Sequence, residues 1–437
     1  MDSLFSAHAH AGLRPAACRF LVAASLAIPN AGGIRAADPP LTLDAARHLA
    51  AERSRRLTGQ DALVAAARQR ATAATRLPDP TLRLGVNNLP VTGAERFSLT
   101  QDFMTMRSVG VAQEFTREEK RKARQTRFER EADAVTATQV AARAEIDREV
   151  ALAWFERHFA ETRRTLLLRQ REEARLQIEA TEALLRGARG STADVLAARS
   201  QVEQLNDRLA EADQRVATAT NALSRWAGPA ATGPLASPPA FDALPFTDEG
   251  LRDRLEHHPQ LAALTKQVDV ARAQAEIART ERRADWSLEL MYSQRGSAYS
   301  NMVSVNVSIP LQWNRKDRQD RELAAELSTL DALTAEREEA ARAHEAEIRE
   351  MLLERQSKLD RRRRYDATLL PLAQDRTRAA LAAYRAGTGS LVAALDARRN
   401  EIEVQLERLQ LERDVALLWA RLNYLVPAGH DAPLPNR

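Results

Sequence analysis

The chain has 437 residues, of which 44% are hydrophobic, 5% aromatic and 28% charged. Its 64 Lys and Arg residues nearly balance its 60 Asp and Glu residues, and both signs are interspersed, which argues against a basic surface for nucleic acid. A single cysteine excludes an intrachain disulfide and a cluster of thiolate metal ligands. The composition favours helices with Ala and Leu seams over a thick globular core.

The N-terminal segment has the pattern of an export signal. Two arginines flank or precede an apolar run, residues 20–28, and small residues suited to cleavage follow over residues 34–37. We predict a signal peptide over residues 1–37. A buried terminal helix is the alternative, but Pro and Gly residues would isolate it from the next helix. Cys18 lies before the apolar run instead of after it, so we do not expect lipidation.

One very long helix is predicted from Thr116 to Arg186, where the chain contains no Gly or Pro. Its apolar and small residues recur at gaps of three and four, and Arg and Glu fill most positions between them. This spacing is typical of a coiled coil. Such a helix would be about 105 Å long, which is too long for an element of an ordinary globular core.

The elements around this helix occur twice. Thr42 can cap a first helix that continues to about Leu77, and Gly190-Ser191 after the long helix matches Gly389-Ser390 in the second half. Each short helix is about half the length of a long helix, so two short helices placed end to end would match one long helix. The linker would then lie halfway along the long helix, in an equatorial region. The predicted order is a first repeat over residues 38–227 (helix, hairpin 81–115, long helix, tip 187–191, helix), a linker over 228–246, a second repeat over 247–426 (helix, hairpin 286–310, long helix, tip 387–390, helix) and a C-terminal tail over 427–437.

The two predicted hairpins carry the pattern of membrane strands. Apolar residues alternate with polar or small ones, as expected where one face meets lipid and the other meets water. No apolar segment after the signal reaches the roughly twenty residues of a membrane helix, and four strands cannot close a barrel, so three chains would have to pool twelve. The predicted lipid-facing residues are Leu82, Leu84, Val86, Val109, Val111, Trp286, Leu288, Leu290, Val303, Val305, Val307 and Ile309.

Residues that could carry chemistry do not form a recognisable site in the sequence. His257-His258 and the scattered His48, His158 and His344 lack metal-ligand spacing, and we interpret Met104 and Met106 as loop or interface packing. No nucleophile motif or phosphate-binding loop occurs, so we expect no metal site, no cofactor and no enzyme activity. For the basic run over residues 361–364, a solvated or paired helix face is favoured over a ring of charge lining a lumen.

Several motifs resemble those of TolC-type outer-membrane efflux proteins over essentially the whole mature length. They are Leu77-Pro78-Asp79-Pro80 before the first strand, Val109 to Phe115 leading to Lys120-Arg121, and Tyr384-Arg385-Ala386-Gly387 before the second tip. The segment Asp102 to Arg107 is most similar to the branch paired with heavy-metal exporters of the resistance-nodulation-division class. The chain departs from the family at one point. The family often has Asp at two positions after each tip, whereas this chain has only the first of them after the first tip, Asp194, and only the second after the second tip, Asp396.

This resemblance implies a mainly α fold with a small β part: an internally duplicated, long-helix coiled-coil barrel with two hairpins per chain that form a shared twelve-stranded membrane barrel in a homotrimer. It also implies a periplasmic adaptor and an inner-membrane resistance-nodulation-division pump as partners, outer-membrane lipid around the strands, and heavy-metal cations as cargo. The tips would contact the adaptor through Gly187, Arg189, Gly190, Ser191, Thr192, Gly387, Thr388, Gly389, Ser390 and Leu391.

The second long helix is expected to move when the duct opens. Pro371 should kink it some fifteen residues before the tip, whereas the aligned residue of the first copy is Glu172. Asp194 and Asp396 complete the predicted gate, with Asp396 bound to an Arg of a neighbouring helix, although a solvated carboxylate stays open as an alternative. The alternative functions are a periplasmic adaptor or a coiled-coil scaffold without channel activity.

Overall fold

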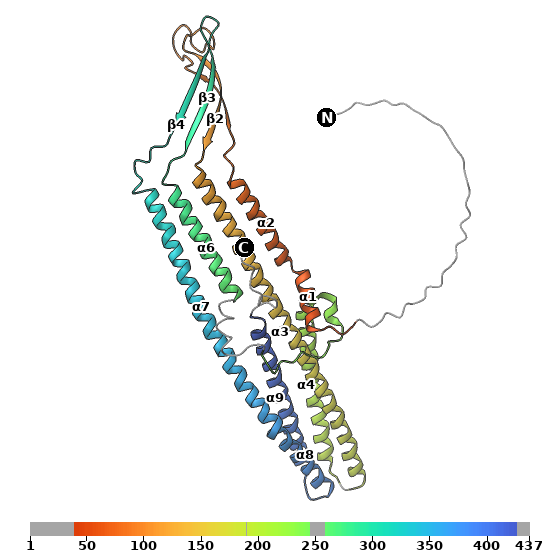
Figure 1. The fold of residues 1–437 in the computed structure, drawn as a ribbon. Helices are drawn as coiled ribbons and strands as arrows, with labels where there is room; N and C mark the ends of the chain where they lie inside the picture. The colour runs from red at the N-terminus through yellow and green to blue at the C-terminus, as the bar shows by residue number, and fades with distance from the viewer. Residues whose placement is uncertain (1–38, 189, 245–257, 426–437) are drawn as a thin grey trace, which may run out of the picture. The chain divides into compact units, whose positions relative to one another are not determined.

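The computed structural model describes residues 39–188, 190–244 and 258–425. The predicted signal peptide, Arg189 of the first tip, the start of the second repeat and the C-terminal tail lie outside the described residues. The chain is mainly helical with one antiparallel sheet, as predicted (Figure 1). Its elements are α1 (Leu43–Arg53), α2 (Arg55–Ala74), β1 (Thr81–Asn87), β2 (Met106–Phe115), α3 (Glu118–Arg186), α4 (Thr192–Ala227), the 3-10 helix η1 (Gly228–Thr232), α6 (Pro259–Thr280), β3 (Trp286–Gln294), β4 (Met302–Ser308), α7 (Gln319–Arg364), the π-helical turn η2 (Tyr365–Leu369), α8 (Leu370–Arg385) and α9 (Leu391–Asn423).

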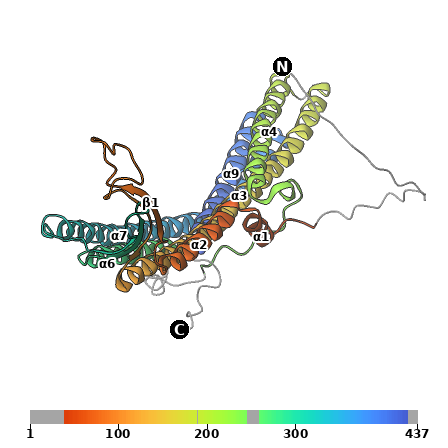
Figure 2. The same cartoon turned by 90° about the horizontal axis from the view of Figure 1, so that it is seen from above.

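The long helix α3 is continuous over 69 residues, which corresponds to about 104 Å. Its buried seam is built largely from small residues, among them Ala132, Ala142 and Val150, and charged residues cover the rest of its surface. The half-length helices lie along it as their lengths predict: α2 and α6 pack against the half near the sheet, and α4 and α9 against the half near the tips (Figures 1 and 2).

Two predicted helices are interrupted. The helix expected from Thr42 to about Leu77 is divided into α1 and α2 at Ser54, whose extended backbone ends one helix while its hydroxyl accepts a hydrogen bond from Leu57 N–H and caps the next. Prediction of a single helix was wrong because Ser competes locally for backbone hydrogen bonds. The second long helix is divided by η2 just before Pro371.

The four strands form one sheet in the order β1-β2-β3-β4. The two hairpins therefore join through β2 and β3, which pair along nine residues from Arg107 opposite Gln294 to Phe115 opposite Trp286. The rings of Phe115 and Trp286 stack at the helix end of this pairing, with centroids 4.3 Å apart. The sequence predicted two hairpins, and the structure shows that the two repeats share a sheet.

The main core lies near the middle of α3, where the linker and the start of the described chain meet. Trp154 and Phe155 are fully buried among residues of α1, α4 and α9. Trp154 Nε1 donates to the carbonyl of Leu41 at 3.1 Å, and Leu41 forms a parallel bridge with Leu235 of the linker. Aromatic side chains of this core thus help to anchor the irregular segments to the rod-like α3.

Candidate functional site

One face of the sheet is apolar and exposed. Residues directly opposite each other in an antiparallel pair project to the same face, and the register places Leu82 opposite Val111, Val111 opposite Leu290 and Leu290 opposite Val305. Leu84 is 73% exposed and Val303 is 67% exposed, so none of the described residues covers this face. All predicted lipid-facing residues within the strands share it, whereas Ile309 lies one residue beyond β4.

The opposite face of the sheet is polar. Arg83 pairs with Glu289 across it at 3.2 Å, and Asn87 Nδ2 donates to the hydroxyl of Ser108 at 3.0 Å. In the described part of the chain β1 and β4 each have a neighbour on one side only, so the sheet has two open edges. None of the described helices is long and apolar enough to cross a membrane.

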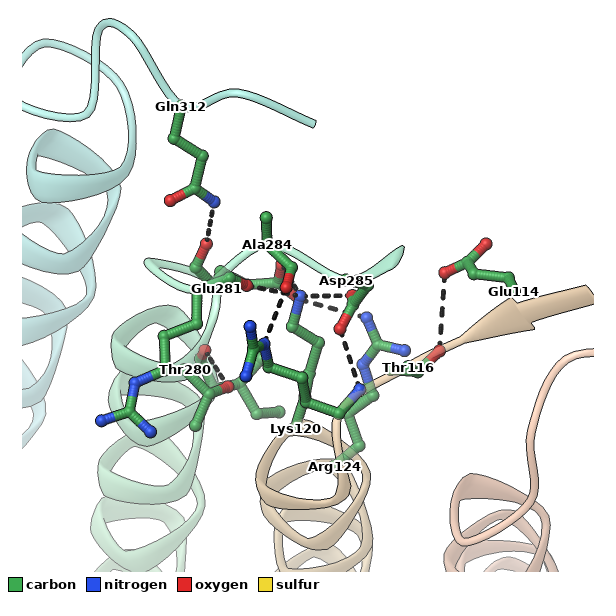
Figure 3. Close-up of polar contacts among 12 residues, drawn as sticks. Glu114, Thr116, Lys120, Arg124, Thr280, Glu281, Ala284, Asp285 and Gln312 are labelled. Carbon is green, nitrogen blue, oxygen red and sulfur yellow. Dashed lines mark hydrogen bonds and ion pairs between the residues drawn. The ribbon is translucent and has the colours of Figure 1, made fainter. Parts of the chain in front are cut away.

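A polar junction joins the sheet to the helices (Figure 3). Lys120, in the first turn of α3, is only 4% exposed, and its Nζ lies 2.6 Å from Asp285 Oδ2 and 2.9 Å from Glu281 Oε2. Asp285 also accepts a hydrogen bond from the backbone N–H of Arg117 at 2.9 Å, and Arg124 donates to Glu281 at 3.1 Å. These contacts fix the start of α3 against the segment that connects α6 to β3.

The ionisation of this junction is coupled. Burial opposes the charge of Lys120, but its hydrogen bonds to Asp285 and Glu281 outweigh burial and raise its pKa. Burial likewise opposes the charge of Asp285, but hydrogen bonds from Lys120 and from Arg117 N–H hold its pKa below the usual value. The sequence marked Lys120 within a motif but not its carboxylate partners, which stand four residues apart where α6 gives way to β3.

The first tip is a tight reversal closed by a capping box. The Ser191 hydroxyl accepts from Asp194 N–H at 3.1 Å, and the Asp194 carboxylate accepts from Ser191 N–H at 3.0 Å. Asp194, predicted as a gate residue, therefore lies in the first turn of α4 and completes its N-terminal cap. A Cβ at Gly190 would lie 3.1 Å from the backbone nitrogen of Leu185, so a side chain here would push the loop away from the helix end. Gly187, Ser191 and Thr192 are exposed.

The second tip is built in a similar way. Gly387 has φ +76°, a conformation that favours glycine, and a Cβ at Gly389 would lie 3.0 Å from the Cβ of Ala383. Ser390 caps α9 by accepting from Ala393 N–H at 3.2 Å. Thr388 is exposed, whereas Leu391 is only 1% exposed and packs inside its own hairpin.

The predicted gate residues are not in one cluster. Pro371 lies in the first turn of α8, and Asp396 is exposed on α9 with no ion pair to the described residues. Asp194 instead lies near Tyr384 of α8, where burial and then the Asp194 charge raise the pKa of the tyrosine. The Tyr384 hydroxyl is buried without a hydrogen-bond partner among the described residues. The sequence marked Tyr384 only as part of a motif.

The histidines are mostly separate. The rings of His258 and His344 lie 4.5 Å apart, and burial lowers the pKa of His258 to about 4. Within residues 39–188, 190–244 and 258–425, no three His, Cys, Asp or Glu side chains are grouped as metal ligands. In the basic run, Arg362 pairs with Asp242 at 2.8 Å and Arg363 with Asp360 at 3.1 Å, which agrees with a paired helix face.

Comparisons with known proteins agree with this architecture. Residues 250–426, essentially the second repeat, match the family model described as outer membrane efflux protein. No curated protein matches the sequence.

Solved structures share the fold over most of the chain. The outer-membrane channel OprN superposes with a TM-score of 0.74 at 17% identity, over 88% of this chain and 89% of that one. CusC, whose structures concern folding and transmembrane channel formation, superposes with a TM-score of 0.72 at 17% identity, over 88% of this chain and 92% of that one. The outer membrane protein VceC from Vibrio cholerae superposes with a TM-score of 0.70 at 17% identity, over 88% of this chain and 95% of that one.

Proposed function

We infer that the chain is a TolC-type outer membrane efflux channel with a periplasmic helical extension, and that it works as a passive exit duct in a tripartite export system. The observation that carries this proposal is the sheet: one face is apolar and exposed, the other is polar, and both edges are open. In a membrane barrel the apolar face of the sheet meets lipid, and the polar face lines the water-filled interior. The protein is a transport protein and not an enzyme.

We propose a homotrimer, which the open edges of the sheet support. Pairing β4 of one copy with β1 of the next continues the sheet, and this head-to-tail contact closes into a ring when the rotation between copies is suitable. Three copies would give twelve strands, within the size range of membrane barrels. The exposed residues of the apolar face would then contact outer-membrane lipid.

Cell fractionation with size measurement in detergent tests this assembly. We expect the protein in the outer membrane fraction, and after extraction at three times the mass of the processed chain. A soluble monomer would contradict the duct. The rival functions fit the structure less well, because an adaptor is expected to have one helical hairpin and compact β domains, and a scaffold leaves the apolar sheet face without a use.

The tips are the proposed contact with the periplasmic adaptor, which would connect the duct to a resistance-nodulation-division pump in the inner membrane. Support comes from the exposed small residues at both tips and from the close loop packing at Gly190 and Gly389. Gly389→Leu should abolish export while trimer and membrane insertion persist. Gly59→Leu is a matched control, because a Cβ there meets nothing within 4 Å. Unchanged export in Gly389→Leu and Gly190→Leu would contradict the assignment.

The gate is proposed at the second hairpin. Pro371 follows the π-helical turn, and the charge of Asp194 in the other tip adds to burial in raising the pKa of Tyr384 near the end of α8. Opening would move the second hairpin below Pro371, and Asp396 would hold the closed state through a bond to an Arg of a neighbouring helix. A covalent cross-link between neighbouring second tips should block conductance. If a cross-link between first tips blocks it instead, the gate belongs to the first hairpin.

The proposed cargo is heavy-metal cations. This proposal rests on the resemblance of residues 102–107 to the heavy-metal branch, since a duct that passes what a pump delivers needs no selective pocket. A strain that lacks this chain but keeps its pump should lose tolerance to such cations. Loss of tolerance to organic compounds alone would reassign the cargo and leave the duct intact.

A further inference from the structure

The polar face of the sheet carries few charges. The register of the strands sends alternate residues of each strand to this face. Within the four described strands its charged residues are Arg83, Glu114 and Glu289, and the other positions on it hold Ser, Thr, Asn, Gly, Ala or Met. Each copy of the chain therefore presents one positive and two negative charges on this side.

The ion pair between Arg83 and Glu289 passes over a whole strand. Arg83 belongs to β1 and Glu289 to β3, and β2 lies between them. Neighbouring strands are about 4.8 Å apart, so β1 and β3 are about 10 Å apart and only long side chains can meet across β2. The residues of β2 opposite this pair are Gly110 and Ala112, which leave room for the contact.

The two charges of this pair balance each other. The side chain of Glu289 is 14% exposed, and its Oε1 is buried and accepts no hydrogen bond from the described residues. Arg83 Nη1 lies 3.2 Å from this oxygen, so it supplies the balancing charge. At distances well beyond 3.2 Å the fields of the two charges largely cancel.

Glu114 has no such partner. It lies where the polar face meets the helices, in a row with Ser287 and Ser308 across β2, β3 and β4. Its side chain is exposed, and its carboxylate accepts a long hydrogen bond of 3.5 Å from the hydroxyl of Thr116 (Figure 3). Among the described residues no cation forms an ion pair with it, so its negative charge is not offset.

A cavity of about 1030 Å³ makes the region around Glu114 accessible to water and ions. The carboxylates of the polar junction, which also border this cavity, are held by Lys120 and Arg124. Arg318 and Glu322 add one charge of each sign to its lining. The charge of Glu114 therefore stays in excess at this end of the polar face.

We propose that Arg83, Glu289 and Glu114 set the ion preference of the strand-lined part of the duct. The inference rests on the proposed function and names the residues that decide which small ions pass along the strands. The Arg83–Glu289 pair is neutral as a unit, and Glu114 adds one negative charge per copy. In the trimer the three Glu114 carboxylates face one water-filled path and raise the concentration of cations there.

This effect depends on salt. The Debye length is about 30 Å at 0.01 M salt and about 3 Å at 1 M, so the field of the carboxylates extends into the path only at low salt. The measurement is the reversal potential of the purified trimer in a planar bilayer that separates two KCl solutions of unequal concentration. It gives the ratio of K⁺ to Cl⁻ permeability, which we expect to exceed 1 at low salt and to approach 1 at high salt.

Single variants shift this ratio in opposite directions. At low salt Arg83→Gln should raise it about threefold, because the charge of Glu289 is then added to that of Glu114. Glu289→Gln leaves Arg83 to offset Glu114 and should bring the ratio to about 1. Glu114→Gln should do the same, since only the neutral pair remains.

The double variant Arg83→Gln with Glu289→Gln separates charge from structure. It breaks the same contact as either single variant but removes one charge of each sign, so the wild-type ratio should return. The matched control is Arg107→Gln, which removes a positive charge from the same sheet. Arg107 lies opposite Val86 on the apolar face, so this variant should leave the ratio unchanged.

The outcomes distinguish the ion preference from the duct itself. Inserted wild-type trimers that carry no current would contradict the duct. Conducting trimers in which Arg83→Gln and Arg107→Gln have the same ratio would overturn the inference and leave the duct standing, as would a double variant that departs from wild type. Glu289→Gln and the double variant decide the question if Arg83→Gln alone does not assemble.

Discussion

Replacing Lys120 by Met tests the role of the polar junction between the sheet and the helices. Methionine keeps most of the packing volume and removes the charge that faces Asp285 and Glu281. Breaking a buried ion pair by removing one partner costs about 3–5 kcal/mol, because the other charge stays uncompensated. Here the side chain of Asp285 is 17% exposed and that of Glu281 is 41% exposed, and each keeps another donor, so we expect about 2–3 kcal/mol.

The expected change in melting temperature follows from the length of the chain. With an unfolding entropy of about 2.1 cal/mol/K per residue and about 400 residues in the processed chain, the entropy of unfolding is about 0.8 kcal/mol/K. Lys120→Met should therefore lower the melting temperature by about 3 °C in detergent, followed by circular dichroism at the helical band. The double variant with Asp285→Asn should lose less than the sum of the single losses.

The matched control is Lys122→Met, two residues along the same helix. Lys122 pairs with Glu118 at 2.7 Å, but both side chains are about 70% exposed, at 71% and 68%. Solvent screens such an exposed pair, so the melting temperature should fall by less than about 1 °C. Equal losses in Lys120→Met and Lys122→Met would refute the argument that burial makes the junction important.

Three further predictions concern other parts of the chain. Because the pKa of Asp285 is lowered in the folded state, its charge stabilises the fold above its unfolded pKa of about 3.9. This stabilisation is lost as the pH falls through the folded pKa. The melting temperature of wild type should therefore fall more steeply below about pH 4 than that of Asp285→Asn. Gly110→Val should prevent pairing of β2 with β3, because a Cβ there would lie 2.9 Å from the carbonyl oxygen of Leu290, and a normal amount of protein in urea-washed membranes would contradict this. Trp154→Ala should cost about 3–5 kcal/mol, seen as a melting temperature about 5 °C lower, because the fully buried indole also donates to Leu41; a change below 1 °C would count against the equatorial core.

Regular periodicity made the helices and strands predictable. An uninterrupted run without Gly or Pro was sufficient to predict α3 as one helix. Strict alternation of apolar and polar residues was sufficient to predict which residues of β3 and β4 share a face. The register of the sheet then follows, because a slip of one residue would exchange the apolar and polar faces. The interruption at Ser54 could not be predicted with the same confidence, since Ser occurs both inside helices and at their ends.

Contacts between distant segments were not accessible from the sequence. The pairing of Lys120 with Asp285 and of Tyr365 with Glu407 depends on which helices lie side by side, and a single sequence with many Arg and Glu residues offers many equivalent partners. Pro371 did indicate an irregularity, but its form, a π-helical turn with a hydrogen bond to α9, comes from tertiary packing. Asp194, predicted only as a gate residue, forms a capping box with Ser191, a local contact that the sequence analysis did not consider.

The most direct test of the central claim is the current through the purified protein in a planar lipid bilayer with no energy source and no partner. A passive duct should insert as a trimer from one side and give stepwise currents that increase in proportion to voltage. Trimers that insert stably into the bilayer and yet carry no current at any applied voltage would contradict the duct.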